Sequence, residues 1–431
     1  MIYKSLNHNA PSVSFRQAVI NGIAPDKGLY FPEKIIPLAP SFFENIEYFT
    51  NEEIAFQVIQ PFTGDDIPEK ELKKIIAESI AFDFPIIKIT KNIYSLELYH
   101  GPTLAFKDVG ARFMARCLAY FNGEDPSEKN TILVATSGDT GGAVADGFLN
   151  VKGVAVIILY PEGKVSDIQE RQLTTLGHNI TALAVDGVFD DCQAMVKEAF
   201  LDADLKHRNL TSANSINVAR WLPQMFYYFF AYSALKKLNQ PLIISVPSGN
   251  FGNIGAGILA KKLGLPIQHF IAATNSNDTV PRFLEDGNYN PTSSIATLSS
   301  AMDVGNPSNF IRIQAMYQDN IVELKRDFSS YSFSDEETLV ALKELYFNHN
   351  YLAEPHGAIG YLGLQKEIKN NADLIGIFLE TAHPIKFLEH VEPALDIKIP
   401  MPKSIAAIMQ KPKKNTKIKT YLDLKKILSS N

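Results

Sequence analysis

The sequence is poor in cysteine and has no long apolar run. Of its 431 residues only Cys117 and Cys192 are cysteines, and they have no metal-ligand spacing. Two such thiols are typical of a protein from a reducing compartment. The most apolar helical candidate, residues 225–235, is too short to cross a bilayer and predicts a buried helix. We therefore expect neither a disulfide scaffold, nor a metal site, nor a membrane protein.

The chain also lacks an excess of charge of one sign. Its net charge is −6 and its pI is near 5.9, which gives no field to attract nucleic acid. The first eight residues have no apolar core of the kind that a signal peptide needs. These features predict a cytoplasmic protein with no nucleic-acid partner.

Apolar runs alternate with helical patterns through much of the chain, which predicts an α/β protein with largely parallel sheets. At this length two or three domains are expected. The predicted strands lie within 86–98 and at 131–136, 154–160, 180–185, 242–246 and 267–273. The predicted helices lie at 51–60, 68–81, 142–149, 166–176, 189–203, 218–238 and 254–263.

One lysine stands in an unusually apolar setting. Lys107 follows Leu104, Ala105 and Phe106 in the segment His-Gly-Pro-Thr-Leu-Ala-Phe-Lys-Asp, residues 100–108, which we call the lysine loop. Desolvation lowers the pKa of a lysine and makes it nucleophilic, so that it can form a Schiff base with a carbonyl such as that of pyridoxal phosphate. Alone, such a lysine is more typical of a side chain that extends along a helix surface into solvent.

Two loops repeat the order strand, glycine-rich turn, helix. The first glycine loop is Thr-Ser-Gly-Asp-Thr-Gly-Gly at 136–142, and the second is Pro-Ser-Gly-Asn-Phe-Gly-Asn at 247–253. This order directs backbone N–H groups and a helix dipole at an anion, although one such loop is often only a tight turn. Two of them together with Lys107 favour a phosphate-bearing cofactor.

At this point the sequence resembles the threonine synthase family, which belongs to the pyridoxal-phosphate (PLP) enzymes of the tryptophan-synthase-β type, or fold type II. The likeness is carried by the lysine loop, the two glycine loops, Asn214-Ser215 through Arg220, and Thr-Ala-His-Pro at 381–384. It runs from Ser14 to about residue 390. The resemblance implies two open, twisted, largely parallel sheets flanked by helices, plus an N-terminal helical and irregular region.

The resemblance also implies how the cofactor PLP would be held. Lys107 would carry it and act as the catalytic acid and base. The backbone amides of Ser248, Gly249, Asn250, Phe251, Gly252 and Asn253 would bind its phosphate. Thr381 would hydrogen-bond the pyridine nitrogen, where a neutral hydroxyl cannot fully protonate the ring as an aspartate would.

For the substrate, the resemblance implies O-phospho-L-homoserine. Its carboxylate would meet Ser137, Gly138, Asp139 and Thr140, and its phosphate would meet Asn214, Ser215 and Arg220, with Lys164 and Ser166 as weaker candidates. A guanidinium fork matches phosphate oxygens well. Asp139 does not fit easily, because an ionised aspartate only accepts hydrogen bonds. Either it is protonated, or it points away and caps the next helix.

The implied reaction converts O-phospho-L-homoserine and water to L-threonine and phosphate by γ-elimination and β-addition. The alternatives are another fold-type-II lyase, such as a threonine or serine dehydratase, and a non-catalytic protein that keeps the fold. The roles of His100, His356 and His383, the group that protonates the leaving phosphate, regulation, and the choice between monomer and homodimer stay open.

The same patterns suggest a division into domains. We expect an N-terminal domain at 1–85, a large PLP-binding domain from 86–130 and 240–400, and a small domain at 131–239. Residues 401–431 form a lysine-rich C-terminal tail that we interpret as a solvated surface.

Overall fold

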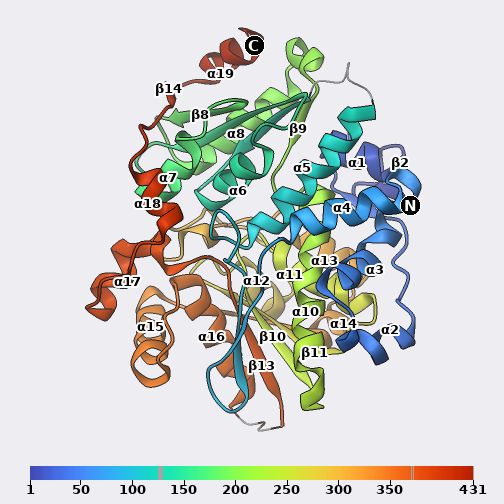
Figure 1. The fold of residues 1–431 in the computed structure, drawn as a ribbon, viewed down its shortest axis with the longest axis vertical. Coiled ribbons are helices and arrows are strands. Elements are labelled where there is room, and N and C mark those ends of the chain that lie inside the picture. Colours follow the sequence, from blue (N-terminus) through green and yellow to red (C-terminus); the bar gives the residue numbers. More distant parts are fainter. Residues whose placement is uncertain (125–129, 370, 372, 431) are drawn as a thin grey trace.

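The computed structural model describes residues 1–124, 130–369, 371 and 373–430 (Figure 1). Their strands form sheets of three, five and six strands. The three-stranded antiparallel sheet has the order β2-β1-β3, with β1 Ile2–Ser5, β2 Val13–Ser14 and β3 Tyr30–Pro32. It lies in the N-terminal region with the helices α1 Phe15–Asn21, α2 Pro40–Asn45, α3 Asn51–Thr63 and α4 Glu69–Ser79.

The six-stranded sheet has the order β12-β11-β10-β13-β5-β4, and only the edge pair β4 and β5 is antiparallel. Its strands are β4 Ile86–Lys88, β5 Ile93–Glu97, β10 Leu242–Pro247, β11 Ile267–Thr274, β12 Phe328–Ser332 and β13 Ile375–Glu380. The central strands β10 and β13 are buried at every residue. Parallel strands need helices on both faces, which explains their continuous apolar sequences.

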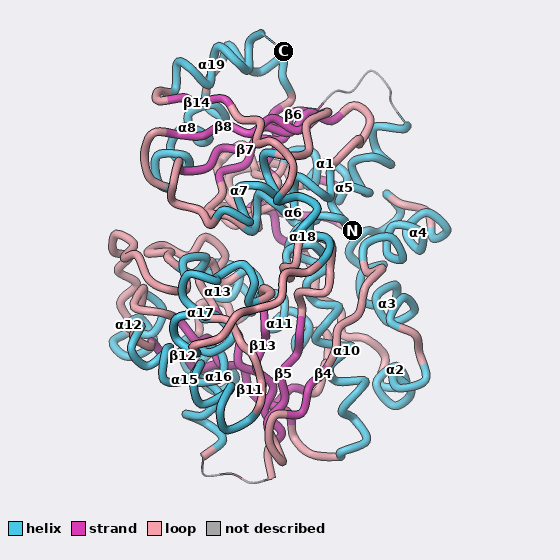
Figure 2. Tube along the Cα trace, turned by 60° about the vertical axis from the view of Figure 1, so that its left-hand side comes forward, coloured by secondary structure: helices cyan, strands magenta, loops and turns pink. Residues whose placement is uncertain are grey.

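The five-stranded sheet is parallel throughout, in the order β14-β8-β7-β6-β9. Its strands are β6 Asn130–Ala135, β7 Val154–Pro161, β8 Ile180–Val185, β9 Leu210–Ser212 and β14 Thr416–Ile418. Figure 2 shows the strands of this sheet at the top and those of the six-stranded sheet at the bottom. The arrangement confirms the predicted α/β class with two largely parallel sheets.

Helices cover both larger sheets and run between them. They are α5 Lys107–Glu124, α6 Asp139–Phe148, α7 Asp167–Thr174, α8 Phe189–Leu201, α9 Val218–Trp221, α10 Phe226–Leu235, α11 Gly252–Lys262, α12 Thr279–Asp286, α13 Phe310–Met316, α14 Ile321–Asp327, α15 Asp335–His349, α16 Pro355–Ile368, α17 Leu388–Leu395, α18 Lys403–Met409 and α19 Tyr421–Ser430. Helix α16 packs on β10, β11 and β13, and α5 packs on α4 and α6. The predicted buried helix is α10, and seven of its residues are buried. No helix of the described part of the chain is long and apolar enough to cross a membrane.

The C-terminal segment is more ordered than its composition suggests. Residues 416–418 form β14, which pairs with β8 at the edge of the five-stranded sheet, and α19 packs on α8. Its lysines are held by acids of that sheet region: Lys417 pairs with Glu162, Lys419 with Asp186, and Lys425 with Asp202 and Asp204. Lys417 and Lys419 are largely exposed, as predicted, while Ile418 between them is buried. The alternation of a strand was therefore present in the lysine-rich sequence.

Candidate functional site

A cavity of about 270 Å³ is lined by the loops that follow β6 and β10. Ligands bind at the carboxyl ends of the strands in parallel sheets, so this is where a site is expected. Every site residue predicted from the sequence lines the cavity except Gly138, which stands at the cap position of α6. The weaker candidates Lys164 and Ser166 are not among the lining residues, and Ser166 caps α7 instead.

Lys107 is the first residue of α5 and lines the cavity. Burial lowers the pKa of Lys107, the charge of Asp139 opposes that shift, and the cations Lys386 and Arg220 reinforce it. Its ammonium nitrogen lies 5.5 Å from the centre of the Phe106 ring. A lysine in these surroundings reaches the neutral, nucleophilic form more easily than one in water.

The lysine loop is tied to the Thr-Ala-His segment that follows β13. The backbone N–H of Phe106 donates to the carbonyl of Thr381 at 2.9 Å, and the N–H of His383 donates to the carbonyl of Leu104 at 3.1 Å. Leu104 adopts a left-handed conformation, with φ 58°, to make this contact. The pairing fixes Lys107 and Thr381, which are 274 positions apart in sequence, on neighbouring walls of one cavity.

The base of the lysine loop is held by a buried aspartate. Asp108 accepts from the backbone N–H of Thr103 at 2.9 Å and from its hydroxyl at 2.5 Å. Gly101 allows this contact, since a Cβ at that position would lie 2.4 Å from a carboxylate oxygen of Asp108. Burial raises the pKa of Asp108 to about 6, although the bonds from Thr103 oppose the shift.

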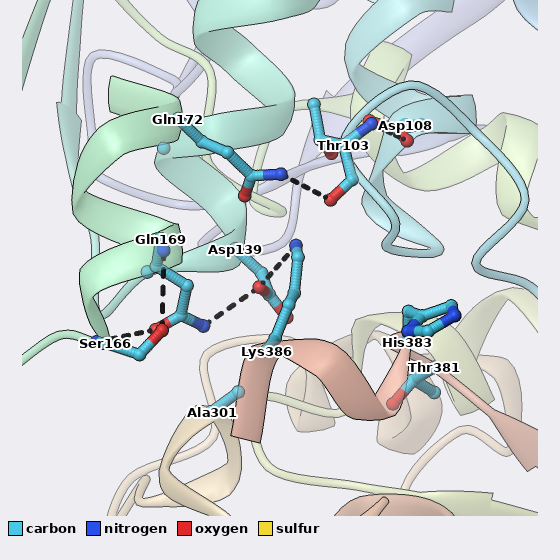
Figure 3. Close-up of polar contacts among 12 residues, drawn as sticks. Thr103, Asp108, Asp139, Ser166, Gln169, Gln172, Ala301, Thr381, His383 and Lys386 are labelled. Atoms are coloured by element: carbon cyan, nitrogen blue, oxygen red, sulfur yellow. Dashed lines mark hydrogen bonds and ion pairs between the residues drawn. The ribbon is translucent and has the colours of Figure 1, made fainter. Parts of the chain in front are cut away.

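The first glycine loop holds Asp139 in an ion pair that the sequence analysis missed. The Nζ of Lys386 lies 2.9 Å from Oδ1 of Asp139, and neither side chain is more than 4% exposed (Figure 3). Burial alone would raise the pKa of Asp139, but the charges of Lys386 and Lys107 hold it below its usual range. Asp139 is also not a helix cap, because Gly138 stands at the cap position of α6 with no side-chain bond. Both interpretations offered for Asp139, protonated or capping, are therefore wrong.

Helix α7 supports this loop from the side of the five-stranded sheet. The side-chain amide of Gln169 donates to Oδ1 of Asp139 at 3.0 Å, and that of Gln172 donates to the carbonyl of Thr103 at 3.0 Å. Gln169 is itself oriented by a capping box with Ser166. Figure 3 shows Gln169 and Lys386 reaching Asp139 from different elements. The first glycine loop and the lysine loop are thus braced by one helix.

The second glycine loop carries no ionisable side chain and opens the helix α11. Phe251 adopts φ 57° at the cap position, and a Cβ on Gly249 would lie 2.5 Å from the Cα of Met302. The carboxamide oxygen of Asn253 accepts from Tyr227 at 2.6 Å and from Tyr228 at 2.7 Å. Its buried nitrogen has no partner among the described residues. A free buried donor beside the first amides of a helix suits an anion.

The segment from Asn214 to Arg220 forms the wall between the two glycine loops. The hydroxyl of Ser215 accepts from the side chains of Asn250 and Asn309 at 2.9 and 3.0 Å. The amide of Asn214 donates to the carbonyl of Ala135 at 3.1 Å. Arg312, which is fully buried, donates to the carbonyls of Ser215 and Ile216 at 3.1 and 2.6 Å and so fixes this turn.

Arg220 is only 3% exposed and faces the cavity. One terminal nitrogen donates to the carbonyl of Ala213, while its buried Nε has no partner in the part of the chain that the structure describes. Burial lowers the pKa of Arg220 to about 10, so its guanidinium stays charged at neutral pH. A buried guanidinium with an unused donor is suited to an anionic ligand, because leaving it unpaired is costly.

The three histidines have structural partners. His100 bonds to Glu97 at 2.7 Å and stacks on Tyr99. The Nδ1 of His383 accepts from the backbone N–H of Ile385 at 3.0 Å, and burial lowers the pKa of His383 to about 4. Of the three, His356 alone lines the cavity.

Sequence reasoning missed Lys386, Gln169, Arg312 and Glu354, a buried glutamate that bonds to Thr381. One signal was present for Lys386. It lies five residues after Thr381, and a buried aspartate such as Asp139 requires a cation partner. Gln169 had the signal of its capping-box spacing from Ser166, and Glu354 lies two residues before His356, whereas no feature of the local sequence marks Arg312.

Three family models match the chain. The model of pyridoxal-phosphate dependent enzymes matches residues 86–378, the model of the threonine synthase N terminus matches 2–80, and that of the threonine synthase C-terminal region matches 357–427. The chain is 46% identical to threonine synthase from Serratia marcescens over 94% of this chain and 93% of that protein. It is 36% identical to threonine synthase from Saccharomyces cerevisiae over 91% and 89%.

Solved structures agree with these matches. The structure of threonine synthase from Escherichia coli superposes with a TM-score of 0.93 at 42% identity, and each chain is covered completely. The PLP-bound threonine synthase from Brucella melitensis gives 0.92 at 33% identity, covering 100% of this chain and 99% of that one. A maize serine racemase, at 15% identity and 0.53, shares the fold. The chain belongs to the threonine synthase family of pyridoxal-phosphate dependent enzymes.

Proposed function

We propose that the protein converts O-phospho-L-homoserine and water to L-threonine and phosphate, with PLP bound at Lys107. The observation that carries this proposal is the cavity, in which Lys107, the second glycine loop and Arg220 face one space. Lys107, with its lowered pKa, would bind the carbonyl of PLP, and the uncharged second glycine loop would bind the phosphate of PLP. The buried Arg220 would bind the phosphate of the substrate.

The residues present fit PLP. The amides of Ser248, Gly249, Asn250, Phe251, Gly252 and Asn253 would hold its phosphate at the N-terminus of α11, and the unpartnered amide nitrogen of Asn253 adds a donor. Thr381 lines the same cavity and would meet the pyridine nitrogen. When bound, PLP supplies an electron sink for negative charge that develops next to the substrate nitrogen.

Substrate recognition divides between two anions. The hydroxyls of Ser137 and Thr140 and the amides that begin α6 would bind the carboxylate, while Asn214, Ser215 and Arg220 would bind the phosphate. Asp139 would repel the substrate carboxylate if it were alone. Because Lys386 balances its charge, we assign Asp139 to holding the loop in place and not to direct binding.

Lys107 is the residue that would move protons. Its Nζ, freed when the substrate amine takes its place, would accept the proton from Cα and return it at the end of the reaction. Loss of a proton from Cβ would allow phosphate to leave from Cγ, which then takes up a proton to become the methyl carbon. Water would add its hydroxyl at Cβ and give up its other proton. The neighbouring cations Lys386 and Arg220 favour the neutral amine that the first step requires.

Two measurements test the proposal. The purified protein should show a visible absorption band when PLP is added, and it should release phosphate from O-phosphohomoserine. Arg220→Ala should lower kcat/KM for phosphate release roughly 30-fold or more, since truncating one partner of a buried charged contact costs about 2–5 kcal/mol. Ammonia release from L-serine or L-threonine without phosphate release from phosphohomoserine would instead assign a dehydratase.

The division into domains at 1–85, 86–130 with 240–400, and 131–239 is also proposed, supported by the separate sheets. We place residues 401–431 with the small domain because β14 extends the five-stranded sheet. We further propose a cytoplasmic location without a nucleic-acid partner, supported by two free, buried cysteines and the acidic pI.

A further inference from the structure

Behind Thr381, on the side away from the cavity, lies Glu354. The hydroxyl of Thr381 donates to Oε1 of Glu354 at 3.3 Å. Thr381 lines the cavity, whereas Glu354 is fully buried and is not among the lining residues. In the described part of the chain Glu354 is the acceptor that the Thr381 hydroxyl meets. The carboxylate of Glu354 therefore lies directly behind the side chain of Thr381.

Glu354 is surrounded by hydrogen-bond donors. It stands at the cap position of α16 and accepts from the backbone N–H groups of His356 and Gly357 at 2.8 and 3.1 Å. Its Oε2 also contacts Nδ1 of His356. A fully buried carboxylate that receives this many donors at the start of a helix is a stable acceptor.

The tautomer of His356 follows from its second ring nitrogen. The backbone N–H of Ala301 donates to Nε2 of His356 at 3.2 Å, so that nitrogen carries no hydrogen. The ring hydrogen therefore lies on Nδ1 and is donated to Glu354. The hydrogen bonds from Ala301 through His356 and the one from Thr381 converge on Glu354, and the remaining acceptor position of Glu354 faces Thr381.

A second buried glutamate, Glu380, favours the protonated form. Glu380 precedes Thr381 and is fully buried, and both of its carboxyl oxygens lack a partner among the described residues. Burial, followed by the charges of Glu354 and Glu97, raises the pKa of Glu380 far above its usual range. Gly357 leaves room for it, since a Cβ there would lie 2.0 Å from its Oε1. Of the two carboxyls, Glu380 is the one whose neutral form is favoured, and Glu354 is the one that accepts the hydrogen bonds.

We propose that Glu354 is a positioning residue that accepts the only hydroxyl hydrogen of Thr381. Thr381 then presents its oxygen to the cavity as an acceptor, and this favours a pyridine nitrogen that carries a proton. This inference rests on the proposed function, which places Thr381 at that nitrogen. A hydroxyl has one hydrogen to donate. If Thr381 gave it to a neutral ring, Oε1 of Glu354 would face an oxygen with no hydrogen between them, which is costly in a buried site.

The consequence concerns the chemistry of the cofactor. A hydroxyl alone cannot charge the ring, as the sequence indicated, but a hydroxyl backed by a carboxylate can favour the charged ring by accepting from its N–H. A protonated ring is the stronger electron sink. The Glu354–Thr381 pair would then stabilise the protonated ring, although less strongly than a single aspartate bonded to the same nitrogen.

The test is the ¹⁵N resonance of the ring nitrogen in the full-length protein reconstituted with ring-¹⁵N-labelled PLP. The wild type should show the upfield resonance of a protonated pyridine nitrogen. In Glu354→Gln the amide oxygen stays with the two His356 donors, and the NH₂ group takes the place of Oε1. The NH₂ group then faces Thr381 and frees the threonine hydrogen, while the N–H of Gly357 loses its acceptor. The resonance should then move downfield to the position of an unprotonated ring.

Glu380→Gln is the matched control, because it replaces a neutral buried carboxyl by a neutral amide of the same shape. It should keep the wild-type resonance. An unprotonated ring in the wild type overturns the inference even if Glu354→Gln fails to fold, and so does an unchanged resonance in a folded Glu354→Gln protein. An absorption band with an unprotonated ring leaves the proposed function intact, whereas absence of any PLP band in the wild type overturns both.

Discussion

The two glycine loops look alike in sequence but differ in how they treat charge. Each follows a buried parallel strand and opens a helix, β6 to α6 and β10 to α11. The first buries a carboxylate, Asp139, and balances it with Lys386 from the segment that follows β13. The second carries no charge, and the amide nitrogen of Asn253 has no partner among the residues that the structure describes.

This difference shows that a strand–glycine–helix motif does not define its ligand. The second loop can attract a dianionic phosphate because nothing in it competes for the amides. The first can accept a monoanionic carboxylate only while Lys386 cancels the charge already there. The ligand preference of each loop is set by the residues around it, and those come from distant parts of the chain.

The largest expected effect comes from removing the balancing cation. Lys386→Met leaves Asp139 buried and unpaired, which should lower the free energy of unfolding by about 3–5 kcal/mol. Denaturant unfolding followed by circular dichroism measures this change. The double variant Lys386→Met with Asp139→Asn should recover most of the loss, because both charges are gone. A single variant as stable as the wild type would contradict the assigned ion pair.

A second prediction compares Asp139 with Asp108, a buried aspartate that forms no ion pair within the described part of the chain. The pKa of Asp108 is raised to about 6, so the folded state binds the proton more tightly than the unfolded state. Stability from this group is present at low pH and is lost as pH rises from about 4 to about 6, by on the order of 3 kcal/mol. Asp139, whose pKa is lowered, acts in the opposite sense and loses its contribution as pH falls.

The measurement is the free energy of unfolding against pH for the wild type and Asp108→Asn. The variant should lose the decline between pH 4 and 6 that is due to this side chain. An identical pH profile for both proteins would show that the Asp108 carboxyl does not titrate in that range.

A third prediction concerns a carboxylate placed in the second glycine loop, where no lysine corresponding to Lys386 balances it. Asn253→Asp keeps the bonds from Tyr227 and Tyr228 but adds a carboxylate beside the amides proposed for the cofactor phosphate. At an effective dielectric typical of proteins the repulsion is worth about 1–4 kcal/mol, so PLP should bind about tenfold more weakly or worse. Titration of the apoprotein with PLP measures this, with neutral Asn253→Ser as control. Equal losses in both variants would assign the effect to shape instead of charge.

The smallest expected effect concerns helix α7, whose residue Gln169 supports the first glycine loop through Asp139. Ser166→Ala removes the cap of α7 that orients Gln169 toward Asp139, which should cost about 1 kcal/mol of stability and also raise KM for phosphohomoserine. Ser334→Ala removes an equivalent cap on α15 and should cost similar stability with no change in KM. A KM change in both variants, or in neither, would remove the link from α7 to the loop.

Much of the fold was predictable because it depends on short-range patterns. The runs at 154–160 and 267–273 became β7 and β11 almost residue for residue, and the patterns at 51–60 and 68–81 became α3 and α4. The central strand β13 and the helices from α12 to α17 were not among the predicted elements, and neither was the structure of the lysine-rich end. Its three-residue strand β14 is stable only because β8 offers an edge, and an alternation over three residues does not by itself predict a strand.

The chemistry-bearing residues divide in the same way. Lys107, the two glycine loops, Arg220 and Thr381 could be named from their local settings, and all of these segments line one cavity. Their charge states could not be named, because the pKa of a buried group depends on which charges lie within a few ångströms. Asp139 illustrates this, since its balancing lysine lies 247 positions away.

The sequence by itself determined the class of fold, the family, and the residues that face the cavity, since each is written in contiguous motifs. Only the tertiary structure decided how those residues are charged and which way their hydrogen bonds point. It brought Lys386 to Asp139, and Glu354 to Thr381, across 247 and 27 positions of chain. Electrostatic and hydrogen-bond energies depend on distance and burial in space, and neither quantity exists until the chain has folded.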